Sequence, residues 1–199
     1  MKNTIGIIGA GNIGLAFATA LARVNISATL SNSRGPETLV DLAARLGPTI
    51  KAGTREEAAS ADIVLVAVNW SKLPAALSGL PDWNGRIVID ANNPIEPPLF
   101  QLAHLDGLTS SEVFSNLVPG ARVIKAFNHL QPDLIAGNPA KEGGRRVLFL
   151  SGDSAAKAVV GTLIERLGFF GLDLGPLALG GQLVQFPGGP LPSHNLVRF

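Results

Sequence analysis

The sequence predicts an α/β fold, with a doubly wound and mostly parallel sheet in a single domain. Short β-branched runs alternate with longer segments of helical period, which is the pattern of βαβ units. The first such run leads directly into a glycine-rich turn and a helical segment. A length of 199 residues is enough for one complete hydrophobic core and too short for two large domains. We expect residues 1–127 to form the core βαβ units and residues 128–199 to add C-terminal strands and complete the substrate pocket.

Eight strands are expected along the chain. The clearest is DIVLVAV, because a continuous apolar run suits a strand that is covered on both faces. The expected strands are residues 4–8, 28–31, 49–51, 62–68, 86–90, 122–127, 147–150 and 170–174.

Five helices are expected between these strands. Pro36 is compatible with the first turn of its helix, Thr54 and Glu57 form a capping box, and Asp153 or Ser154 begins the last helix. Only that helix is expected after residue 127, and the Pro- and Gly-rich tail from residue 187 to 199 is expected to pack against the domain. The expected helices are residues 13–24, 36–46, a short one after Thr54, 110–117 and 155–167.

The composition favours small-molecule chemistry. With 16 basic and 15 acidic residues, the chain shows no electrostatic footprint for nucleic acid or an anionic membrane. The absence of cysteine excludes disulfides and thiolate chemistry, and no metal site is expected. The first 22 residues could pass for a secretory signal, but their glycines have a specific use, described next. No other segment has the roughly 18 apolar residues that span a bilayer, so we expect a cytoplasmic protein.

The segment GAGNIG at residues 9–14 follows an expected strand and begins an expected helix, which is the context of a Rossmann-type dinucleotide-binding turn. Gly9 would permit the tight turn, Gly11 would let the backbone approach a pyrophosphate, and Gly14 would let the helix pack closely on the strand. The free amides of Asn12 and Ile13 would face the anion, with the helix dipole behind them. The alternative is a glycine-rich turn that holds no ligand.

The end of the second expected strand favours NADP over NAD. NAD sites usually place an acidic residue there to bind the ribose diol, whereas NADP sites favour arginine. The segment LSNSRG contains no acid, and Ser33 and Arg34 could share a 2′-phosphate through charge-assisted hydrogen bonds. The alternative is that Arg34 is an exposed residue of a surface turn.

Polar side chains follow three further strands, where an open α/β sheet binds its ligand. These are Asn69-Trp70, Asn92-Asn93 and Asn128-His129. Neutral amides and an indole suit a carboxamide and a planar ring. We therefore predict that Asn69, Asn93 and Asn128 line one crevice with the glycine turn.

Proton donors are few, since the chain has no tyrosine. Only Lys125, His129 and, less favourably, His104 or His194 could supply the general acid that carbonyl reduction needs. A flavin-like ring delocalises its own charge and can take a proton from water, so positioning suffices for hydride transfer to it. This difference favours a flavin-type acceptor.

Several segments resemble the NADP oxidoreductases that depend on the deazaflavin coenzyme F-420, together with the cytosolic reductase domain of the STEAP metalloreductases. The similar segments are GIIGAGNIG, SNSRGPE, VAVNW, VIDANNPIE, VIKAFNHLQPDLIAG and SGDSAAKAVVGTLIERLGFFGLDLGPLA. The resemblance implies that Ser33 and Arg34 hold the 2′-phosphate and that Asn12 and Ile13 meet the pyrophosphate. The residues that it places around the nicotinamide are Asn69, Trp70, Asn93, Ala126, Phe127 and Asn128, and Val68 is a further candidate for cofactor binding.

Two features depart from the family pattern. Thr38 stands where some family members have a basic residue, and the tail QFPGGPLPSHNLVRF has no role that can be transferred. The membrane and haem parts of the STEAP proteins are missing from the sequence, so ferric reduction is unsupported.

The leading hypothesis is an NADP(H)-dependent oxidoreductase that exchanges hydride with a deazaflavin or a flavin. One alternative is imine reduction of the pyrroline-5-carboxylate reductase kind, which needs a substantial helical C-terminal domain. Another is a non-catalytic NADP(H)-binding redox sensor, which would bind the cofactor without turning over any acceptor.

The apolar tail and the dimers common in the resembling family predict a homodimer. Light scattering at micromolar protein concentration should give twice the monomer mass, and a monomeric mass would contradict this prediction.

Overall fold

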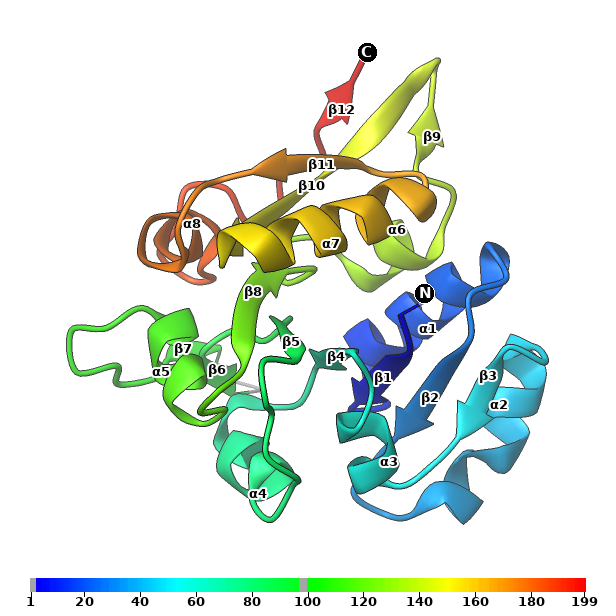
Figure 1. Cartoon of the computed structure of the whole chain (residues 1–199). Coiled ribbons are helices and arrows are strands. Elements are labelled where there is room, and N and C mark those ends of the chain that lie inside the picture. The colour runs from blue at the N-terminus through cyan, green and yellow to red at the C-terminus, as the bar shows by residue number, and fades with distance from the viewer. Residues whose placement is uncertain (1–2, 97–99) are drawn as a thin grey trace.

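A computed structural model of the chain describes residues 3–96 and 100–199, and Figure 1 shows its arrangement. The strands are β1 (Ile5–Ile8), β2 (Ala28–Ser31), β3 (Ile50–Ala52), β4 (Ile63–Val66), β5 (Ile87–Asp90), β6 (Ile95–Glu96), β7 (Gln101–Leu102), β8 (Arg122–Ala126), β9 (Ala140–Lys141), β10 (Gly144–Gly152), β11 (Phe170–Asp173) and β12 (Val197–Arg198). The helices are α1 (Asn12–Arg23), η1 (Pro36–Leu39), α2 (Val40–Leu46), α3 (Arg55–Ala59), η2 (Trp70–Lys72), α4 (Leu73–Leu77), α5 (Ser110–Asn116), α6 (Pro132–Ala136), α7 (Ser154–Arg166) and α8 (Leu177–Val184).

The main sheet runs in the order β11-β10-β8-β5-β4-β1-β2-β3. Strands β3, β2, β1, β4, β5 and β8 are parallel, and β10 pairs antiparallel with β8. Parallel strands bring their carboxyl ends to one edge of the sheet, so the segments that follow β1, β2, β4, β5 and β8 share that edge. This arrangement is the doubly wound fold that the sequence predicts.

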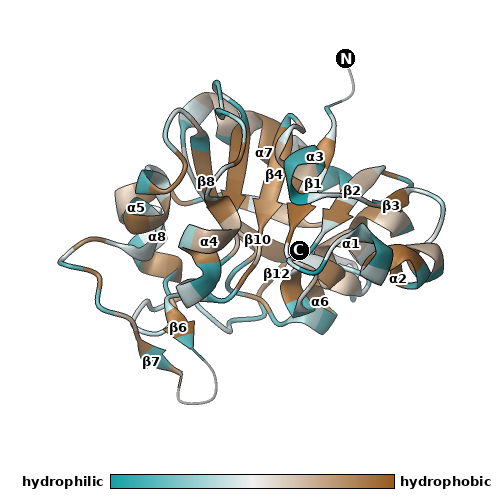
Figure 2. Ribbon diagram, turned by 90° about the horizontal axis from the view of Figure 1, so that it is seen from below, coloured by the Kyte–Doolittle hydropathy of each residue, from teal (hydrophilic) through white to brown (hydrophobic). Residues whose placement is uncertain are grey.

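Each central strand is buried on both faces. In β4, Ile63 and Leu65 pack into the core beneath α1 and α7, whereas Val64 and Val66 pack into a second core with α3, α4 and α5. The period of two in a strand sends alternate side chains to opposite faces. Figure 2 shows the resulting layer of hydrophobic strands between helices.

The second half of the chain contains more helix than the sequence predicts. Beyond residue 127 the expectation of a single helix is wrong, because α6 and α8 accompany α7. Helix α6 has only five residues, too few for a clear period. Helix α8 contains Gly180 and Gly181, which disfavour a helix locally but allow close approach to Ser151 and Ser111.

Some elements differ from the expected ones at their ends or were not expected. Residues 36–46 begin as the 3-10 helix η1 before becoming α2, and β10 extends well beyond the expected residues 147–150. The β6–β7 hairpin, which projects from the molecule in Figure 2, was not expected. The expected caps at Thr54 and Asp153 are confirmed, and the tail packs on the domain because β12 pairs with β10.

Candidate functional site

The glycine turn between β1 and α1 is shaped by very close backbone contacts. A Cβ atom at Gly14 would lie 1.8 Å from the carbonyl oxygen of Gly9, and one at Gly9 would lie 2.1 Å from that of Ala67. Gly9 also has a φ of +110°, a conformation that other residues rarely adopt. At Gly11, by contrast, nothing lies within 4 Å of a Cβ position. The first and third glycines are therefore required by packing, while Gly11 leaves the start of α1 open.

The N-terminus of α1 is suited to an anion. Gly11 is its N-cap and provides no side-chain hydrogen bond, and the first turn contains no acidic residue. Asn12 is exposed and Ile13 is half-buried. Free amides at the start of a twelve-residue helix, together with its dipole, attract phosphate groups.

The turn after β2 presents Ser33 and Arg34 to solvent. The Asn32 side chain fixes this turn, because its Oδ1 accepts from the Arg34 amide (2.9 Å) and its Nδ2 donates to the Thr38 hydroxyl (2.9 Å). That hydroxyl donates in turn to the Gly35 carbonyl (2.8 Å). Thr38 is thus a structural brace of the turn. Gly9 N–H donates to the Ser31 carbonyl (3.0 Å), which joins this turn to the glycine turn.

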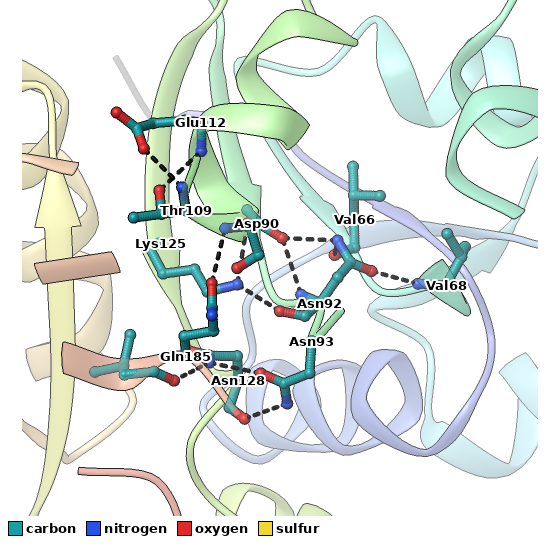
Figure 3. A network of polar contacts seen from close by, with 12 residues as sticks. Val66, Val68, Asp90, Asn92, Asn93, Thr109, Glu112, Lys125, Asn128 and Gln185 are labelled. Carbon is teal, nitrogen blue, oxygen red and sulfur yellow. Dashed lines mark hydrogen bonds and ion pairs between the residues drawn. The ribbon is translucent and has the colours of Figure 1, made fainter. Parts of the chain in front are cut away.

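Asn92 joins the carboxyl ends of β4 and β5. Its Oδ1 accepts from Val68 N–H (2.9 Å), and its Nδ2 donates to the Val66 carbonyl (3.1 Å) and to Asp90 Oδ1 (2.8 Å). The side chain is buried, so these bonds occupy its amide within the fold. Figure 3 shows this network from close by.

A buried ion pair lies beneath the same strand ends. Lys125 Nζ donates to Asp90 Oδ2 (3.0 Å) and to the Asn92 carbonyl. Both side chains are fully buried. Burial lowers the pKa of Lys125 from its ordinary value, and the Asp90 carboxylate opposes that shift.

Asn93 and Asn128, which follow β5 and β8, form a reciprocal hydrogen-bonded pair. Asn93 Nδ2 donates to the Asn128 carbonyl (3.0 Å), and Asn128 Nδ2 donates to Asn93 Oδ1 (2.9 Å) and to the Val184 carbonyl (2.7 Å). Gln185 Oε1 accepts from Ser110 N–H (2.8 Å), so the end of α8 is held at two points. These contacts bring the ends of β5, β8 and α8 together.

Ala126 and Phe127 can face a ligand only through their backbone. Their side chains are buried, and the Phe127 ring packs edge-on against Phe17 of α1 with centroids 4.9 Å apart. Phe127 has a φ of +66°, in the left-handed region that is rare for aromatic residues.

The structure places the strand ends with Asn69, Asn93 and Asn128 at the same edge of the sheet as the glycine turn, as predicted. Asn93 and Asn128 are in direct contact, whereas Asn69 is exposed at the N-cap of η2, beside half-buried Trp70. Two cavities of about 290 and 250 Å³ lie at the opposite edge, lined in part by Ile63 and Arg86. That the residues at the carboxyl edge form one crevice therefore stays a prediction.

Sequence reasoning missed two contributors to this region, Asp90 and the end of α8, and it named Asn92 only as a polar residue that follows its strand. Asp90 and Asn92 stood within or beside a recognised strand, but nothing in their spacing showed that they bond to each other. The end of α8 was missed because its glycines hide the helix. A buried acid at the end of an apolar strand, followed by asparagines, was the one available signal.

The candidate proton donors are unsuitable as general acids. Lys125 is buried in its ion pair, and burial lowers the pKa of His129 to about 4, so its ring is neutral at pH 7. His104 pairs with exposed Asp106, and His194 lies on the exposed tail. None of these residues contacts the Asn93–Asn128 pair through a hydrogen bond found in the described part of the chain.

Membrane-spanning helices and metal-binding clusters are both absent from residues 3–96 and 100–199. None of the helices there combines the length and the hydropathy needed to cross a membrane. No group of three or more His, Cys, Asp or Glu side chains is placed to hold a metal ion in those ranges.

The fold and the glycine turn define the class of Rossmann-type dinucleotide-binding proteins. Residues 4–94 match the family described as NADP oxidoreductase, coenzyme F420-dependent. The chain is related to this family of oxidoreductases, which confirms the resemblance seen in its sequence.

Metalloreductase STEAP3 of Rattus norvegicus is 30% identical over 194 residues, which cover 96% of this chain and 38% of the relative. The chain therefore spans less than two fifths of that protein's length.

Two solved structures share the fold over most of both chains. A hypothetical protein from Sinorhizobium meliloti is 44% identical, with a TM-score of 0.93 over 99% of this chain and 96% of the other. A protein of Arthrobacter sp. FB24, to which F420-dependent NADP-reductase activity is ascribed, is 27% identical. Its TM-score is 0.72 over 88% of this chain and 86% of the other.

The glycine geometry predicts losses of stability of different size for two similar substitutions. Gly14→Ala should lower the free energy of unfolding by roughly 1–3 kcal/mol or more, because its methyl group meets a backbone oxygen. Gly11→Ala should lower it by less than about 1 kcal/mol, since the site is open. Urea unfolding of both variants checks this, and equal losses would show that the two glycines do not differ as described.

The burial of His129 predicts an acid-dependent loss of stability. Folding favours the neutral ring, so its contribution is complete above the unfolded pKa of about 6.5 and falls as the pH drops to about 4, by a total on the order of 3 kcal/mol. The His129→Leu variant should lack this pH-dependent loss of stability. Urea unfolding of both proteins between pH 7 and pH 4 measures the difference, and parallel pH profiles would refute the assignment.

Proposed function

We propose that this chain binds NADP(H) along the carboxyl edge of its parallel strands and transfers a hydride between the nicotinamide and a flavin-like acceptor, either deazaflavin coenzyme F-420 or a flavin. The observation that carries the proposal is the pair of adjoining turns after β1 and β2. One presents an open helix N-terminus and the other presents an arginine with no acidic residue in the turn. Pyrophosphate and 2′-phosphate are the anions that such turns bind.

The adenosine end is assigned to Ser33 and Arg34. Both are exposed, and no hydrogen bond or ion pair of either side chain is found among the described residues. The Asn32–Thr38 brace holds the backbone that carries them, so their position is set before a ligand arrives. An arginine can make two parallel charge-assisted bonds to a phosphate.

The rest of the cofactor is assigned along the sheet edge. Gly9, Gly11, Asn12, Ile13 and Gly14 would hold the pyrophosphate. The nicotinamide would lie near the ends of β4, β5 and β8, with contacts from Val68, Asn69, Trp70, Asn93, Ala126, Phe127 and Asn128.

The chemistry assigned to these residues is positioning. NADPH supplies the hydride when bound, and neutral amides orient its ring without changing charge during transfer. Because neither Lys125 nor His129 is placed to donate a proton, an acceptor that takes its proton from water suits the site better than an alcohol or keto substrate. The C-terminal part of the chain argues against imine reduction. Residues 144–173 extend the main sheet through β10 and β11, which differs from the large helical domain of that class.

The role of Arg34 predicts a selective loss of NADPH affinity. Losing its contact with the 2′-phosphate should cost on the order of 1.5–3 kcal/mol, so Arg34→Ala should weaken NADPH binding roughly tenfold to a hundredfold. NADH binding should barely change, because NADH has no such phosphate. Ser33→Ala should act in the same direction by less, and Arg45→Ala on α2 serves as a control.

Calorimetric titration of NADPH and NADH against these variants measures the effect. An equal loss for both cofactors would show that Arg34 supports the fold and does not recognise the phosphate. Anaerobic titration of the NADPH-loaded protein with flavins, deazaflavin and cyclic imines, followed by nicotinamide absorbance, identifies the acceptor. Cofactor binding without turnover of any acceptor would favour a redox sensor.

A further inference from the structure

We propose that the buried Lys125–Asp90 pair is a positioning device that fixes the nicotinamide side of the site by acting through Asn92. This inference rests on the proposed function. The pair cannot touch a ligand, because both side chains are fully buried. Its influence must therefore pass through the groups to which it is bonded.

Asp90 uses both carboxylate oxygens to hold its surroundings. Oδ1 accepts from the backbone N–H (3.0 Å) and the side-chain Nδ2 (2.8 Å) of Asn92, while Oδ2 accepts from Lys125 Nζ (3.0 Å). These bonds fold the turn after β5 back against Asp90, the last residue of the strand. Figure 3 shows that the three residues form one continuous group.

Lys125 reaches the same turn from the neighbouring strand. Residues Asp90 and Lys125 are direct partners in the β5–β8 register, and Nζ also donates to the Asn92 carbonyl. The turn after β5 is therefore held from β5 by an acceptor and from β8 by a cation. This cross-strand hold fixes how the ends of the two strands lie relative to each other.

Asn92 transmits this hold in two directions. Toward β4, its side-chain amide is hydrogen-bonded to the carbonyl of Val66 and to the N–H of Val68. Along the chain, the next residue is Asn93, whose carboxamide is paired with Asn128. Val68, Asn93 and Asn128 are three of the residues assigned to the nicotinamide.

Stability alone does not account for the pair. A buried ion pair is often no more stabilising than apolar residues of similar volume, since desolvating two charges offsets their attraction. Apolar side chains at both positions could fill the core, but they could not bond the Asn92 backbone. The pair is the element that sets this geometry.

Two double variants separate positioning from packing. Lys125→Met with Asp90→Leu removes both charges and the carboxylate that accepts from the Asn92 backbone and side chain, whereas Lys125→Met with Asp90→Asn removes the charges but keeps a carbonyl oxygen at residue 90. Neither leaves an unpaired buried charge. Lys157→Met with Asp173→Asn, which removes the 2.8 Å ion pair between α7 and β11, is the matched control.

The measurement compares two ligands by calorimetry. NADPH spans the whole site, and adenosine 2′,5′-bisphosphate lacks the nicotinamide half. The Leu-containing double variant should bind NADPH about tenfold more weakly, the scale of one or two lost hydrogen bonds. The Asn-containing one should lose about threefold, and each should bind the bisphosphate within about twofold of the unmodified chain. The α7–β11 control should bind both ligands unchanged.

Each outcome decides the inference. Folded double variants that bind NADPH like the unmodified chain, or that lose affinity for both ligands equally, would overturn it. If the Leu-containing variant does not fold, the NADPH and bisphosphate affinities of the Asn-containing variant decide the question. An unmodified chain that binds neither ligand would instead refute the proposed function, so the two failures are distinguishable.

Discussion

The contact between Gly14 of α1 and the carbonyl of Gly9 is the constraint on which the rest of this molecule depends. It brings the helix so close to β1 that a methyl group at Gly14 would lie 1.8 Å from the oxygen. This approach directs the N-terminus of α1 at the carboxyl edge of the sheet. It also brings Phe17 onto Phe127, at the end of β8, so one contact ties the phosphate side of the candidate site to its opposite end.

The two ends of the candidate site are built in different ways. The end proposed for the adenosine is an exposed turn whose backbone is braced by Asn32 and Thr38, leaving the side chains of Ser33 and Arg34 in solvent. The end proposed for the nicotinamide rests on buried groups that are bonded to one another across β4, β5 and β8. An exposed cation suits recognition of a phosphate from water, while a fixed network suits orientation of a neutral ring.

The order and type of the central elements could be predicted from the sequence, because glycines, caps and apolar runs are local signals. The glycine turn and the Thr54 box are examples. Pairings between distant residues could not be predicted. Lys125 meets Asp90 and Asn92 only because of the β5–β8 register, and Asn128 meets Val184 across 56 residues. Helix α8 was hidden because Gly180 and Gly181 serve packing against Ser151 and Ser111 at the expense of helix propensity.

We propose that one cofactor spans these two ends along the carboxyl edge of the sheet. A crystal structure of the protein with NADP+ tests it most directly. We expect the 2′-phosphate on Arg34, the pyrophosphate over the amides of Asn12 and Ile13, and the nicotinamide beside Asn93 and Asn128. A cofactor bound at the opposite edge, among the cavities near Ile63 and Arg86, would contradict this binding mode.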